Sequence, residues 1–283
     1  MVSALSKPIG RMRRVPGIRD ALSMMAAASG HVLLRRAPAQ GTGFVSSETP
    51  IIITGMHRSG TSLVARLLER GGMYIGGSWL DKNDEALHFS RANRAMLGEG
   101  PYALRDYGWT APKTAEFISA RRGYAERAAA RMSAFFADLR EERVWGWKDP
   151  RTCLTLPIWL RIYPGARVLH VVRDGRSVAL SLTDRDDLQP AFGLSLWEHY
   201  VTRVEEVLET MPDSHHHTVR FEDVTQAPAE TLPKLYEFAR LEQPTRLDAI
   251  VADVDAKRAT ARLDDPRLAG MGDHPLLHQY GYR

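Results

Sequence analysis

The chain has 283 residues but only one cysteine, Cys153. A single cysteine excludes an internal disulfide, so a disulfide-stabilised secreted domain is not expected. The apolar stretch 21–34 is shorter than the roughly 20 residues that a membrane span needs, and it contains Ser, Gly and His. The apolar and charged fractions, 44% and 25%, are those of an ordinary globular protein. These features favour a cytoplasmic protein.

The net charge of +4 is unevenly distributed. Residues 1–48 contain seven basic and two acidic side chains, a net charge of +5, so the remainder carries −1. We therefore divide the chain into a basic N-terminal arm and linker, 1–48, and one large domain, 49–283. The arm is expected to be solvated or loosely docked, with peripheral contact to anionic lipid as the alternative. Nucleic acid is not an expected partner, because the arm lacks interleaved aromatic residues.

Beyond the arm, apolar runs of strand length alternate with helical patterns, which predicts an α/β fold with a central parallel sheet between two layers of helices. The expected strands are 50–54, 143–147, 167–172 and 216–221. The expected helices are 61–70, 85–98, 113–140, 153–162, 175–184, 191–210 and 228–240. Gly123 is a point at which the long helix over 113–140 can be interrupted. In such a fold, ligands bind beyond the carboxyl ends of the strands.

The segment PIIITGMHRSGTS, residues 50–62, combines a buried strand, a glycine-bounded turn and a helix start. We call residues 55–60 the phosphate loop, because loop N–H groups and a helix N-terminus favour bound phosphate. The spacing is that of a Walker-type loop, but Thr61 stands where its lysine is expected. Arg58 supplies a basic side chain earlier in the loop. This difference predicts a nucleotide other than ATP or GTP.

Two later segments place basic residues at the ends of predicted strands. In WGWKDPRTC, residues 145–153, Lys148 and Arg151 come to the same edge of the sheet as the phosphate loop. In VLHVVRDGRSVALS, residues 168–181, Arg173 ends a strand and Ser181 lies two turns into the next helix, where both can bind one phosphate. A third segment, RFEDV at 220–224, offers Glu222 or Asp223, either as a partner for a basic residue of the site or as a helix cap, and structural support is the preferred role. Taken alone, each could be an ordinary turn.

Together these motifs resemble the sulfotransferase family that uses 3′-phosphoadenosine-5′-phosphosulfate (PAPS), over about residues 50–240. Four motifs in the family's order carry the resemblance, including the WKDPR–VVRDGR arrangement of its tyrosylprotein and bacterial carbohydrate or lipid branches. The resemblance implies a P-loop-type three-layer sandwich and sulfuryl transfer from PAPS to an acceptor hydroxyl, with 3′,5′-bisphosphoadenosine (PAP) released. The cofactor-binding residues it implies are Arg58, Ser59, Gly60, Thr61, Ser62, Arg173, Ser181, Arg258 and Arg262.

The same resemblance implies a catalytic group made of cations and one general base. Arg58 and Lys148 would stabilise the leaving phosphate. His88 is preferred as the base, ahead of Glu85 one helical turn away, with Asp81 third. No metal is required, because fixed cations stabilise the charge. The alternatives are a P-loop nucleotide kinase or NTPase and a non-catalytic nucleotide-binding module.

Overall fold

The computed structural model describes residues 49–75, 85–99, 113–139, 144–252, 254 and 263–282. All of them belong to one compact unit that spans Pro38–Arg283. The N-terminal arm, Asp81, Arg258 and Arg262 lie outside the described residues, so the predictions made for them stay predictions.

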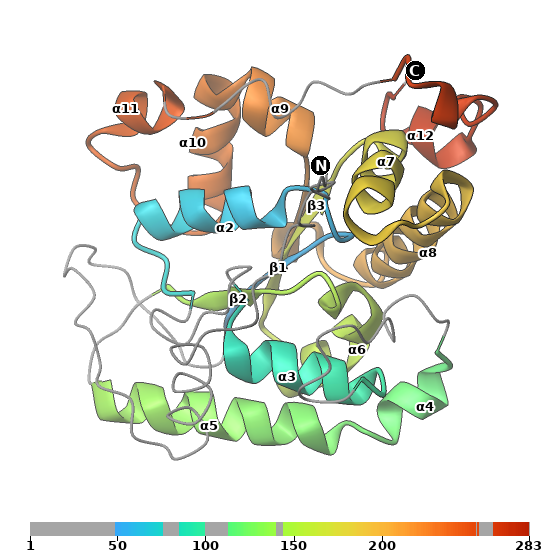
Figure 1. Cartoon of the computed structure of the whole chain (residues 1–283). Helices are drawn as coiled ribbons and strands as arrows, with labels where there is room; N and C mark the ends of the chain where they lie inside the picture. Colours follow the sequence, from blue (N-terminus) through green and yellow to red (C-terminus); the bar gives the residue numbers. More distant parts are fainter. Residues whose placement is uncertain are drawn as a thin grey trace, which may run out of the picture. The chain divides into compact units, whose positions relative to one another are not determined.

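Four parallel strands form the central sheet in the order β2-β1-β3-β4 (Figure 1). Their bounds are β1 Ile51–Thr54, β2 Gly146–Lys148, β3 Arg167–Val172 and β4 His216–Arg220. The chain leaves β1 toward β2 on one side and then crosses to β3 on the other. This order creates a switch point between β1 and β3, where ligands of open α/β sheets bind.

Strand β2 lies later than the predicted range 143–147. Its register pairs Gly146 with Ile51 and Lys148 with Ile53, so the four-residue β1 limits the length of its partner. Gly146 is required at this position, because a Cβ there would lie 1.9 Å from the Ile51 carbonyl oxygen. The shift places Lys148 at the last position of the strand.

Helices flank the sheet and follow the predicted order. They are α2 Thr61–Arg70, α3 Leu87–Met96, α4 Ala115–Ser119, α5 Gly123–Leu139, α6 Thr152–Ile162, α7 Gly175–Asp186, α8 Pro190–Leu208, α9 Phe221–Gln226, α10 Pro228–Phe238, α11 Leu247–Ala252 and α12 Pro275–Gln279. The helix expected over 113–140 is interrupted before Gly123, the residue at which the sequence allowed a break. Tight i→i−3 bonds from Arg121 and Arg122 end α4, and α5 begins at Gly123.

Two hydrophobic cores show that the sheet is covered on both faces. Ile51 and Ile53 pack with α2, α9 and α10, whereas Ile52 packs with α3 and α5 to α8. The alternation along β1 is that of a strand whose successive side chains point to opposite faces. In Figure 1, α2 and α10 lie on one side of the strands, and α3, α5 and α6 on the other. The predicted three-layer α/β sandwich is therefore confirmed. No helix in the described part of the chain is both long and apolar enough to cross a membrane.

Candidate functional site

The phosphate loop connects β1 to α2 in a constrained backbone conformation. Arg58 has φ 72° and Gly60 has φ 88°, so both occupy the left-handed region. The Ser59 N–H donates to the Met56 carbonyl oxygen at 3.0 Å and closes the turn. Helix α2 has no acidic residue in its first turn. Its N-terminus therefore keeps the partial positive charge that attracts an anion.

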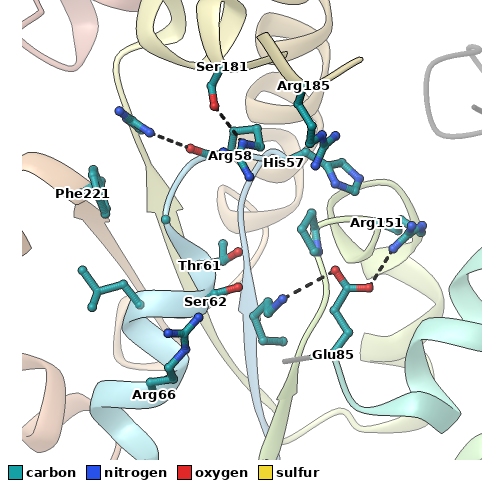
Figure 2. A pocket seen from close by; sticks show the side chains of 15 residues that line it. His57, Arg58, Thr61, Ser62, Arg66, Glu85, Arg151, Ser181, Arg185 and Phe221 are labelled. Carbon is teal, nitrogen blue, oxygen red and sulfur yellow. Dashed lines mark hydrogen bonds and ion pairs between the residues drawn. The ribbon is translucent and has the colours of Figure 1, made fainter. Parts of the chain in front are cut away.

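Arg58 and Arg173 join the ends of β1 and β3. The Arg58 Nε donates to Ser181 Oγ at 2.8 Å (Figure 2). Arg173 Nη1 donates to the Arg58 carbonyl oxygen at 3.1 Å. Burial lowers the pKa of both guanidinium groups; Arg185 adds to the shift at Arg58, whereas Glu222 opposes it at Arg173. Poorly hydrated cations held close together favour a bound polyanion.

Lys148 and Glu85 meet on the opposite wall of the same pocket, which has a volume of about 480 Å³. The Lys148 Nζ lies 3.5 Å from Glu85 Oε1, and their exposed fractions are only 1% and 4%. Glu85 comes just before α3, and Lys148 ends β2. A lysine and a carboxylate buried together in a pocket are a typical pair for proton transfer and charge stabilisation.

Arg151 holds the other oxygen of Glu85. Its Nη1 lies 3.0 Å from Glu85 Oε2 and 3.1 Å from Asp149 Oδ1, and its Nε lies 3.4 Å from Glu99 Oε2. Burial works against the charge of Arg151, but the three carboxylates outweigh burial and raise its pKa. Burial raises the pKa of Glu99, although Arg151 and Arg94 oppose that shift. Figure 2 shows Glu85 directed toward Arg151.

Comparison with known proteins decides which family this site belongs to. The profile of the sulfotransferase family matches residues 50–245, more than half of the chain. This chain belongs to the sulfotransferase family. It is therefore an enzyme that transfers a sulfuryl group, and PAPS is the donor that its motifs indicate. The kinase or NTPase and the non-catalytic alternatives are thereby set aside.

Solved sulfotransferase structures share the fold at low sequence identity. The sulfotransferase domain of the Synechococcus PCC 7002 olefin synthase is 18% identical, with a TM-score of 0.52, over 86% of this chain and 86% of that domain. Sulfotransferase STF1 from Mycobacterium tuberculosis H37Rv is 14% identical, with a TM-score of 0.52, over 80% of this chain and 78% of its own. No curated protein sequence matches the chain.

Most of the site residues expected from the motifs meet in one pocket of this sulfotransferase. The pocket is lined by Arg58, Gly60, Thr61, Ser62, Glu85, Lys148, Arg173 and Ser181. Ser59 is fully buried in the phosphate loop and does not line the pocket. Because three strand ends supply the phosphate loop, Lys148 and Arg173, the parallel sheet brings most of these residues together.

His88, the base preferred from the sequence, is not among the residues that line the pocket. It lies on α3, and burial, followed by the charges of Arg131 and Arg91, lowers its pKa to about 4. Its imidazole is therefore neutral near pH 7. The structure brings Glu85 to the pocket and gives no support to the preference for His88.

Several pocket residues were missed by the sequence analysis. Arg66 follows Ser62 by four residues on α2, and Arg185 follows Ser181 by four residues on α7. That helical spacing was the available signal, because residues four apart share one helix face. His57 also lines the pocket, and burial followed by the charges of four cations keeps its pKa well below the usual value.

Glu222 supports the site rather than lining it. Its Oε1 accepts from the Asp174 backbone N–H at 3.2 Å, and its Oε2 accepts from the Tyr282 hydroxyl at 2.8 Å. These bonds fix the turn that follows Arg173, as expected for a supporting residue. Among the described residues, no cluster of His, Cys, Asp and Glu side chains could hold a metal ion.

Proposed function

We propose that the phosphate loop and the N-terminus of α2 bind the 5′-phosphosulfate of PAPS, while Arg173 and Ser181 bind its 3′-phosphate. Arg58 would contact both ends of this region, since it extends from the loop to Ser181. Arg258 and Arg262 remain candidates for closing over the 3′-phosphate. The observation that carries the proposal is the Lys148–Glu85 contact in the pocket that also contains the phosphate loop.

The reaction moves one sulfuryl group. The acceptor hydroxyl oxygen forms a bond to sulfur, and the bond between sulfur and the bridging phosphate oxygen breaks. PAP leaves with that electron pair, and the acceptor proton passes to the Glu85 carboxylate, which acts as general base. We propose Glu85 for this role because it lines the pocket and contacts Lys148.

Lys148 and Arg58 would stabilise the charge that develops on the leaving phosphate. Removing a single such donor in other enzymes lowers the rate by about 100- to 1,000-fold. Fixed cations in a buried pocket can provide this stabilisation, so we propose that the enzyme requires no metal ion. The acceptor we propose is a hydroxyl group of a carbohydrate, a lipid or another small molecule. We further propose a cytoplasmic enzyme, with peripheral membrane contact through the arm as an option.

The donor assignment is tested by thermal unfolding with PAP in EDTA, compared with Mg-ATP. We expect PAP to raise the melting temperature in EDTA and Mg-ATP to have a small effect. An Arg173→Ala variant should lose most of the PAP effect, because we assign Arg173 to the 3′-phosphate. Stabilisation by Mg-ATP alone would contradict the assignment.

The base assignment is tested with Glu85→Gln and a matched His88→Gln. The acceptor is first identified by mass spectrometry of metabolites from cells with and without the protein. Glu85→Gln should lower kcat by about 100-fold or more, since general base catalysis contributes that much. His88→Gln should stay within a few-fold of wild type. The reverse order of effects would restore His88 as the base.

A further inference from the structure

Arg151 is a buried guanidinium surrounded by carboxylates from three separate segments. Glu85 precedes α3, Glu99 follows α3, and Asp149 lies in the turn after β2. All three contact the guanidinium at 3.0–3.4 Å. We call Arg151 with these three acids the Arg151 cluster. The Arg151 side chain is 9% exposed, whereas those of Glu99 and Asp149 are 0% exposed.

A second layer of hydrogen bonds fixes the cluster from behind. Asn93 on α3 donates to Asp149 Oδ2 at 2.8 Å and to Thr152 Oγ1 at 3.0 Å. Its Oδ1 accepts from Thr155 and from the Trp159 indole, both at 2.7 Å. With both amide hydrogens and its oxygen engaged, Asn93 allows one orientation of its side chain. Asp149, and through it Arg151, is therefore held in one position.

Within the Arg151 cluster, Arg151 and Glu85 line the pocket, whereas Glu99 and Asp149 do not. Lys148 contacts one oxygen of Glu85 and Arg151 the other. Other titratable or charged groups of the described residues face this region, from the phosphate loop, α2, the end of β3, α7 and α8: His57, Arg58, Arg66, Arg173, Arg185 and Tyr200. Arg94 lies farther away and pairs with Glu99 at 3.2 Å.

We propose that Arg151 is a positioning residue that orients the Glu85 carboxylate and keeps it ionised, while Glu99 limits how strongly Arg151 does so. This inference rests on the proposed role of Glu85 as the general base. A carboxylate held by two cations is fixed in direction and is protonated only at lower pH. The same cations would make the Glu85 carboxylate too weak a base if no other carboxylate partly neutralised them. Glu99 and Asp149 share the charge of Arg151.

The proposal predicts opposite effects of two substitutions on the pH dependence of kcat/KM. Arg151→Met removes a positive charge 3.0 Å from Glu85, so the acidic limb should move up by about 1 pH unit or more. Glu99→Gln removes a negative charge behind Arg151, so the acidic limb should move to lower pH. The shift should be about half a pH unit, because Glu99 lies farther from Glu85 than Arg151 does. A purely structural role would not give shifts of opposite sign.

A rescue variant separates charge from geometry. Arg151→Lys keeps the positive charge but lacks the fork that contacts three carboxylates. The acidic limb should return toward the wild-type position, while kcat stays at least about 10-fold below wild type because Glu85 is less well oriented. KM for PAPS should change little in this variant, since the loss concerns the acceptor proton.

Arg176→Met is the matched control. Arg176 is as buried as Arg151, its side chain being 9% exposed, and it pairs with Asp174 at 2.7 Å. It does not line the pocket, so its removal should leave the acidic limb in place. If Arg151→Met fails to fold, Glu99→Gln still tests the proposal through its downward shift.

The outcomes separate this inference from the proposed function. If Glu85→Gln retains the wild-type acidic limb, Glu85 is not the base and the proposed function fails at that residue. If Glu85→Gln abolishes the limb, but Glu99→Gln leaves it unmoved or raises it, the base assignment stands and the positioning role of Arg151 is overturned.

Discussion

Arg58 and Gly60 both have positive φ angles in the phosphate loop, but for different reasons. Arg58, at φ 72°, is an ordinary L-residue in a sparsely populated conformation, as often seen at functional sites. The resulting path of the chain aims its side chain at Ser181 and its carbonyl oxygen at Arg173. Gly60, at φ 88°, leaves room for the Phe221 ring, because a Cβ there would lie 2.1 Å from Cδ2.

Gly60→Ala should destabilise the enzyme and weaken PAP binding. Gly270 provides the control, since it has φ +79° and a Cβ added there would meet no atom within 4 Å. Gly270→Ala should cost about 1 kcal/mol of unfolding free energy for the backbone alone. Gly60→Ala should cost about 1–3 kcal/mol more, because the added methyl group also displaces Phe221. Denaturant unfolding measures both, and equal losses would show that Phe221 moves aside freely.

Most of the pocket-lining residues could be predicted from the sequence, whereas the choice between Glu85 and His88 could not. Arg58, Lys148 and Arg173 each follow a recognisable strand, and parallel strand ends meet at one edge. Glu85 and His88 are one turn apart before and inside α3, where spacing does not say which side chain faces the sheet edge. Which of the two side chains lines the pocket depends on contacts with Lys148 and Arg151, and the positions of those two side chains depend on the tertiary structure.

At the scale of elements, Asn93 ties α3 to α6 and to the turn after β2. Its side chain is fully buried among Asp149, Thr152, Thr155 and Trp159. Helix α3 packs mainly through apolar residues such as Phe89, whose ring stacks on Trp147 at 4.1 Å. Apolar packing holds the helix against the sheet, and the amide fixes its register along α6.

Asn93→Ala and Asn93→Asp should both destabilise the enzyme, but with different pH dependence. Asn93→Ala leaves buried groups without their partner and should cost about 1–3 kcal/mol. Asn93→Asp adds a buried carboxylate beside Asp149, so it should cost more at pH 7 and less as the pH falls and one acid becomes protonated. Unfolding free energies at pH 7 and pH 5 measure the difference. Identical pH dependence for the two variants would contradict the argument.

Element boundaries depended on contacts that a local pattern does not contain. Helix α2 and strand β3 begin and end as predicted, because glycines or polar residues bound a clear apolar run. The break between α4 and α5 comes just before Gly123, where the sequence allowed one, whereas the late start of β2 depends on its pairing with β1. The short helix α9 was not predicted, because its six residues follow β4 directly.

At the scale of the whole domain, a buried histidine makes stability depend on pH. His170 lies in β3 with 0% exposure, and burial lowers its pKa to about 3. Its two ring nitrogens have no hydrogen-bond partner among the described residues. The unfolded chain binds a proton near pH 6.5, but the folded chain does not until about pH 3. Stability is therefore lost as the pH falls through this window.

His170→Leu should make the enzyme more resistant to acid. The slope of unfolding free energy against pH between about 6 and 4 should decrease by up to about 1.4 kcal/mol per pH unit. His278→Leu, at an exposed site, is the control for replacing a histidine by leucine. Urea unfolding at several pH values measures the slope. If His170→Leu leaves it unaltered, the folded chain accommodates the imidazolium form.

The position of β1 also has a consequence for how the domain forms. β1 is synthesised before β2, β3 and β4, and its two neighbours in the sheet begin only at Gly146 and Arg167. Both pairings span about 100 residues, so their loop-closure entropy must be overcome before either strand is stabilised, and such topologies fold slowly. During synthesis, the strand that leads into the phosphate loop stays without its two neighbouring strands while about the next hundred residues are added. A strand that comes early in the sequence is thus paired late in folding.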